Sequence, residues 1–257
     1  MTLHKIYTTF FDEEMKSRGF KRKGKLYYRL CGEILQGVVL KAINPYTIHF
    51  FFTPYWMENI IMETNPKLSK GYWAEQGLEV SPGSSSYFKP ENVELNCDFM
   101  SACFDVAKKH ILPVMDKVNS LEAYFEYCTP HWSGFDDERA YKRWVKFKPG
   151  EIDPKHSHLD AIFDPTITIL WHCYSRYLYQ ACLKYSIDKG DITKGYELLQ
   201  EKMAILGLCT DIDLGPKRRY EEYMTEDGLE RAKKLIDDRK KRMKQRLKDE
   251  LGLEVED

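Results

Sequence analysis

The hydrophobic positions near the N-terminus first follow a helical period. Within residues 2–18, apolar side chains recur near the 3.6-residue spacing of a helix that buries one face. These side chains are Ile6, Phe10, Phe11 and Met15. Gly19 follows directly and is typical of the residue that ends a helix. The pattern therefore predicts one amphipathic helix over residues 2–18.

After Gly24 the period changes from helical to strand-like. Three runs are rich in apolar, β-branched and aromatic residues, and apolar side chains alternate in the first and the third. The runs cover Lys25–Leu30, Leu35–Ile43 and Tyr46–Thr53. Because only short turns separate them, we predict an antiparallel meander that packs on the first helix.

The rest of the chain is mainly helical in pattern. Residues 54–95 are rich in Gly, Ser and Pro, and we predict a loop there with at most one strand. Further helices are predicted from Asn96, at Leu121–Tyr127, from Asp164 to Gly190, at Thr193–Leu206 and, as one helix or a pair, over 217–251. The start at Asp164 rests on an N-cap acid followed by Pro165. We expect an α+β domain over residues 1–130 and a helical extension over residues 131–257, packed on the first part.

The fold class that follows is α+β. It has an antiparallel sheet packed on helices and a helical C-terminal half that ends in a long charged helix. From Glu230 to Glu250 that helix carries ten cations and five acids. Its narrow apolar stripe consists of Leu229, Ala232, Ile236, Met243, Leu247 and Leu251, with a polar gap at Arg239 or Lys240. Such a helix either docks along its own domain or pairs with a partner protein, a second copy or nucleic acid.

Composition narrows the class of protein. Of the 257 residues, 43% are hydrophobic and 31% are charged, which is typical of a globular protein. The net charge of −1 excludes a global attraction to nucleic acid or to an anionic membrane. Three further features predict a cytoplasmic protein without a membrane partner. The seven cysteines include no CxxC pair, the N-terminus lacks a signal-peptide pattern, and the sequence has no long apolar run.

A cluster of cations follows the first helix. It consists of Lys21, Arg22, Lys23 and Lys25, and Tyr27 and Tyr28 come directly after it. These residues suit a nucleic-acid contact, in which cations hold phosphates and aromatic rings stack on bases. They equally suit an edge strand that charge protects from aggregation. With Arg239, Lys240 and Arg242 of the last helix, the four cations form the candidate binding surface.

The sequence holds one weak candidate for a catalytic or metal site. His156 and His158 are two residues apart and Asp160 follows, a spacing that lets two imidazoles and a carboxylate share a metal. No second ligand motif accompanies them, so we expect no bound metal and no cofactor. No catalytic residue is assigned, and the sequence favours a protein without enzymatic activity.

The N-terminal fifth of the chain resembles a bacterial family. The matching residues are Gly19, Phe20, Lys21, Arg22, Lys23, Gly24, Tyr28 and Arg29. They lie between a helix and two apolar strands, as in the family known as domain of unknown function 4304. The resemblance implies an α+β domain and implies no reaction.

Three functions follow from these observations. The leading one is a non-enzymatic protein-interaction module, analogous to immunity or inhibitor proteins. The second is a nucleic-acid-binding protein that uses the basic N-terminal turn and the C-terminal helix. The third is an enzyme with a site near His156, His158 and Asp160. Another protein is the expected partner, and the C-terminal helix is the surface on which a homo-oligomer would form.

Overall fold

A computed structural model describes most of the chain. The described residues are 1–41, 47–57, 77–81, 92–127, 142–146, 155, 166–170, 172–205 and 215–255. They contain a seven-stranded sheet in the order β1-β2-β3-β4-β5-β7-β6, in which every neighbouring pair is antiparallel. The strands are β1 (Lys21–Lys23), β2 (Leu26–Cys31), β3 (Ile34–Lys41), β4 (Thr47–Pro54), β5 (Gly77–Ser81), β6 (Lys142–Lys146) and β7 (Thr166–Leu170).

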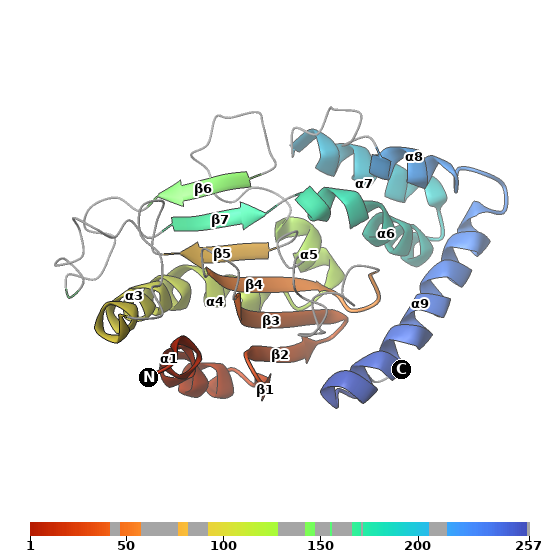
Figure 1. The fold of residues 1–257 in the computed structure, drawn as a ribbon. Helices are drawn as coiled ribbons and strands as arrows, with labels where there is room; N and C mark the ends of the chain where they lie inside the picture. The colour runs from red at the N-terminus through yellow and green to blue at the C-terminus, as the bar shows by residue number, and fades with distance from the viewer. Residues whose placement is uncertain are drawn as a thin grey trace.

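The described helices are α1 (Leu3–Ser17), α3 (Val93–Val106), α4 (Leu112–Lys117), α5 (Leu121–Tyr127), α6 (His172–Lys189), α7 (Ile192–Ile205), α8 (Gly215–Glu221) and α9 (Gly228–Leu251). Helices α1, α3, α4 and α5 lie along the sheet, and α6–α9 gather at one end of it (Figure 1). A π-helical turn, Ala107–Ile111, joins α3 to α4. The α+β fold with a long charged C-terminal helix is confirmed. No helix in the described ranges is long and apolar enough to cross a membrane.

The N-terminal part follows the predicted order of helix and meander. The predicted helix is α1, and the three predicted strands are β2, β3 and β4. All eight residues of β3 and all eight of β4 are buried, so these central strands are covered on both faces. The alternating pattern of the sequence had indicated one buried face for β4, but its polar residues His49 and Thr53 are buried as well.

Helices α1 and α4 pack on one face of the sheet. The Tyr7 hydroxyl of α1 donates to the carbonyl of Val38, and the ring of Phe11 lies 6.4 Å from that of Phe50. The amide of Gln36 donates to the carbonyl of Met115, at the end of α4. Gln36, Val38 and Phe50 share one face because Val38 and Phe50 are register partners and side chains two residues apart point the same way.

Helix α9 reaches the opposite face of the sheet. In Figure 1 it descends from the group formed by α6, α7 and α8 toward β1 and β2. Tyr28 lies next to Tyr27 in β2, so the two side chains point to opposite faces. The Tyr27 ring packs on α1, at 5.5 Å from Tyr7, whereas Tyr28 bonds the last residue of α9. Helix α1 and the C-terminal end of α9 thus contact opposite faces of the N-terminal part of the sheet.

The helix predicted to start at Asp164 is wrong in its first part. Residues Thr166–Leu170 form strand β7, which pairs with both β5 and β6, and helix α6 begins only at His172. The run Thr-Ile-Thr-Ile is β-branched at every position, and this preference for extended backbone outweighed the helix-start signal of Asp164 and Pro165.

The same strands correct the expected domain boundary at residue 130. Strands β6 and β7 come from the part that was expected to be a helical extension, and they join the sheet that begins with β1. Backbone hydrogen bonds between β5 and β7 therefore connect residues 1–130 with residues 131–257 in one sheet. The helical part begins with α6 and ends with α9.

The apolar stripe of α9 is buried within the chain itself. Its buried residues are Gly228, Ala232, Ile236, Arg239, Met243, Leu247 and Leu251. Arg239 fills the polar gap in the stripe and is only 9% exposed. The structure therefore shows α9 docked with its apolar face against its own domain, which is one of the arrangements expected for this helix.

Candidate binding cleft

Strands β1 and β2 hold the C-terminal end of α9. The ammonium groups of Lys21 and Lys23 donate to the carbonyls of Gly252 and Glu250, the first over 3.5 Å. The Tyr28 hydroxyl donates to the carbonyl of Leu251 over 2.8 Å. Burial raises the pKa of Tyr28, which keeps this hydroxyl protonated and able to donate.

These contacts explain part of the basic turn in structural terms. The last carbonyls of a helix lack partners within the helix and carry its partial negative charge. Lys21 and Lys23 supply both hydrogen bonds and positive charge at that end. Two of the predicted binding cations therefore fasten α9 to the sheet.

A cleft of about 1220 Å³ lies beside this junction. Its described lining comes from the segment around β2 and β3, from α9 and from the residues after α9. Five cationic and two acidic residues are among the residues that line it: Lys21, Arg29, Lys240, Lys244, Lys248, Glu33 and Glu254. Gly19, Leu30, Gly32, Tyr55, Gly252, Leu253 and Val255 complete the lining. The cleft is thus basic although the whole chain is nearly neutral.

Three lysines of the cleft form a row along α9. Lys240, Lys244 and Lys248 are spaced by four residues, which places them above one another on one side of a helix. Each follows a residue of the buried stripe, as Lys244 follows Met243, so the row runs along the edge of the docked face. Exposure rises along the row, from 23% of the Lys240 side chain to 61% of Lys248.

Glu33 connects α9 to the loop after β4. Its carboxylate accepts hydrogen bonds from the Lys240 ammonium and, over 3.1 Å, from the indole of Trp56. Burial alone would raise the pKa of Glu33, but the hydrogen bonds from Lys240 and Trp56 outweigh it and lower that pKa below its ordinary value. Glu33 therefore stays ionised and neutralises Lys240 at this end of the row.

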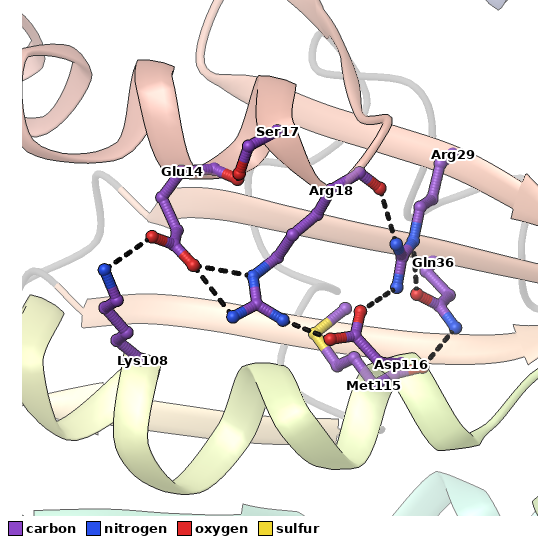
Figure 2. A network of polar contacts seen from close by, with 8 residues as sticks. All are labelled: Glu14, Ser17, Arg18, Arg29, Gln36, Lys108, Met115 and Asp116. Carbon is purple, nitrogen blue, oxygen red and sulfur yellow. Dashed lines mark hydrogen bonds and ion pairs between the residues drawn. The ribbon is translucent and has the colours of Figure 1, made fainter.

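Arg29 is a rigid cation of the cleft. Its guanidinium donates to Gln36, to the carbonyl of Arg18 and to Asp116, over 2.8, 2.6 and 2.7 Å (Figure 2). It also lies 4.4 Å from the ring centroid of Phe20. These fixed partners belong to β3, the end of α1 and α4 and hold the planar group in one orientation, so Arg29 anchors this wall of the cleft.

The same network joins α1 to α4. Asp116 accepts from both Arg29 and Arg18, and Glu14 accepts from Arg18 and Lys108 (Figure 2). Hydrogen bonds from Lys108 and Arg18 lower the pKa of Glu14 although burial opposes that shift. The network anchors the wall of the cleft that carries Arg29.

The seven predicted binding cations lie in different places in the structure and make different contacts. Lys21 and Lys240 line the cleft together, although they are far apart in the sequence. Lys23 holds the end of α9, and Arg22 lies 3.4 Å from Asp12.

Arg22, Lys23 and the remaining three predicted cations do not line the cleft in the described structure. Arg239 is buried in the docked stripe and does not belong to an exposed surface, which corrects its assignment. Lys25 is half-buried, and Arg242 is exposed on α9.

Sequence reasoning missed three cations of the cleft. Lys244 and Lys248 could have been found, because with Lys240 they repeat every four residues beside the apolar stripe. Arg29 carries no such signal, because its place depends on the pairing of β2 with β3 and on the packing of α4.

The candidate metal site cannot be placed. His156, His158 and Asp160 lie outside the described residues. Within the described ranges, no group of three His, Cys, Asp or Glu side chains is arranged to hold a metal ion.

Comparisons with protein-family models, with curated proteins and with solved structures found no match. The resemblance to the family of unknown function therefore stays a prediction.

Proposed function

We propose that the protein is a non-enzymatic interaction module that binds an acidic segment of another protein in the cleft between α9 and the β2–β3 hairpin. The observation that carries this proposal is the lining, in which five cationic residues outnumber two acidic ones. The volume of about 1220 Å³ exceeds the roughly 300–1000 Å³ of small-molecule pockets and suits a stretch of polypeptide.

The lining favours a protein over a nucleic acid. Binding of single strands relies on aromatic rings that stack on bases, and the aromatic residue among the described lining, Tyr55, is only 2% exposed. Leu30 is half-buried in the lining and offers an apolar contact, which an acidic segment with aliphatic residues can use.

The setting of this module is part of the proposal. We assign it to the reducing cytoplasm of a bacterium, supported by the free thiols of Cys31, Cys97, Cys103 and Cys182 and by the resemblance of the N-terminal segment. An immunity-like or inhibitor-like role suits a basic cleft that receives an acidic partner. The apolar stripe of α9 is already covered by its own chain, so we place the partner in the cleft and not on that stripe.

The test is binding of a fluorescent glutamate-rich peptide, measured by anisotropy. The double variant Lys244→Glu, Lys248→Glu reverses two charges of the cleft, and we expect it to weaken binding at least tenfold, about 1.4 kcal/mol. Binding should also weaken as salt is raised, because exposed charges are screened.

The matched control is Lys233→Glu, Lys234→Glu. Both lysines are exposed on α9 and lie outside the described lining of the cleft, so the same change of net charge should leave affinity almost unchanged. Equal losses in both variants would mean non-specific attraction. If a single-stranded oligonucleotide binds more tightly than the peptide, and the cleft variant loses that binding, the assigned function changes to nucleic-acid binding.

A further inference from the structure

The residues after α9 turn back into the cleft. Gly252 has a φ of +63°, the left-handed conformation that glycine adopts without strain. The amide of Gly252 donates to the carbonyl of Lys248 over 3.0 Å, and the amide of Leu253 donates to Leu247 over 3.2 Å. The first of these hydrogen bonds, from the glycine after the helix to the carbonyl four residues earlier, is that of the αL motif, and Leu253 beside it is buried, at 7% exposure. The chain therefore leaves the helix in a fixed direction.

That direction places the chain's own acid beside the lysine row. Leu253, Glu254 and Val255 all line the cleft. The Glu254 carboxylate lies 3.4 Å from the Lys248 ammonium. An acidic side chain between two aliphatic ones thus already occupies part of the surface on which the proposed partner would bind.

The tail contact is weaker than the turn that precedes it. The Glu254 and Lys248 side chains are 81% and 61% exposed, and an ion pair so exposed contributes only about 0–1 kcal/mol. Leu253, in contrast, is buried and hydrogen-bonded. Leu253 is therefore held in place, whereas the Glu254 carboxylate can be displaced from the Lys248 ammonium.

We infer that Glu254 and Val255 occupy the binding site of the partner segment when the partner is absent. That segment alternates acidic and aliphatic residues, and on binding it displaces Glu254 and Val255 from Lys248. The inference rests on the proposed function and specifies its ligand. A partner carboxylate would replace Glu254 at Lys248, and an aliphatic side chain would contact the apolar lining at Leu30 and Leu253. The tail thereby lowers the affinity of the free cleft for weak acidic competitors.

The experiment uses the full chain and two labelled peptides of equal charge, Leu-Glu-Val-Glu-Asp and Ser-Glu-Ser-Glu-Asp. We expect Glu254→Gln to bind the first peptide several-fold more tightly than the unaltered protein, because Lys248 loses its internal competitor. Glu230→Gln removes the same charge from an exposed position at the start of α9 and should leave affinity unchanged. The serine peptide should bind several-fold more weakly than the aliphatic one.

The outcomes separate the two proposals. If Glu254→Gln binds no more tightly than the unaltered protein, or the serine peptide binds as tightly as the aliphatic one, the inference about the tail is overturned while the cleft remains a binding site. If neither peptide binds any of the three proteins, the proposed function itself fails, and the tail inference falls with it.

Discussion

The Tyr28 hydroxyl donates a 2.8 Å hydrogen bond to the carbonyl of Leu251, and so joins the second strand of the sheet to the last residue of α9. Both groups are buried, and 223 residues separate them in the sequence. Lys21 and Gly252, which are joined by a hydrogen bond beside this one, both line the cleft. The cleft therefore exists only while α9 is docked.

Tyr28→Phe tests this docking. Loss of the hydroxyl leaves the Leu251 carbonyl without that donor, and we expect a loss of about 0.5–1.5 kcal/mol in the free energy of unfolding, measured by urea denaturation. Hydrogen exchange at the amides of Gly252 and Leu253 should become faster. Unchanged exchange there, with unchanged stability, would mean that the bond does not hold the helix.

Glu33 gives stability a specific pH dependence. Its pKa is lowered in the folded state, so its contribution is fully present above the ordinary glutamate pKa of about 4.3 and is lost as pH falls through the lowered folded value. We expect the unaltered protein to be more stable than Glu33→Gln by a constant amount above about pH 5 and by a shrinking amount below about pH 4.

Glu197→Gln is the matched control for that titration. Glu197 pairs with Lys194 on the surface of α7, where 58% of its side chain is exposed. Its stability difference from the unaltered protein should be small at every pH. A difference for Glu33→Gln that grows toward acid would contradict the assigned role of Lys240 and Trp56.

Gly37 tests the packing of the central strands. A Cβ at this position would lie 2.2 Å from the ring of Phe51, its register partner on β4, and that ring is fully buried. Gly37→Ala should therefore destabilise the protein by about 1–3 kcal/mol, although alanine normally suits a strand better than glycine. Gly215→Ala, where a Cβ meets no atom within 4 Å, should be nearly neutral. Equal melting temperatures for the two variants would refute this packing.

The sequence predicted those elements whose signals are local. The change of period around Gly19 and Gly24 was enough for α1 and the strands that follow it. The narrow stripe of α9 was enough for the helix itself, but it left open whether that helix docks on its own domain or pairs with a partner. Local signals failed at Thr166–Leu170, where partners on β5 and β6 decide the conformation. Helix-start residues and β-branched residues competed there, and the sequence alone does not show the neighbouring strands.

The candidate site was predictable in parts for the same reason. Lys21 and Lys240 were recognised as cations, but only the fold brings them to one cleft. Arg239 has the same charge as Lys240 and lies one position earlier, which turns it by about 100° around the helix into the buried stripe. Charge identifies candidate residues, and packing decides which of them face a ligand.

The most direct test of the central claim is a nuclear magnetic resonance titration of the protein with the Leu-Glu-Val-Glu-Asp peptide. We expect the amide shifts that change with peptide to cluster at residues 29–33 and 240–255, and the side-chain ammonium signals of Lys244 and Lys248 to move with the same affinity. Changes confined to other surfaces, such as α7 and α8, or no saturable change at the cleft, would contradict the account.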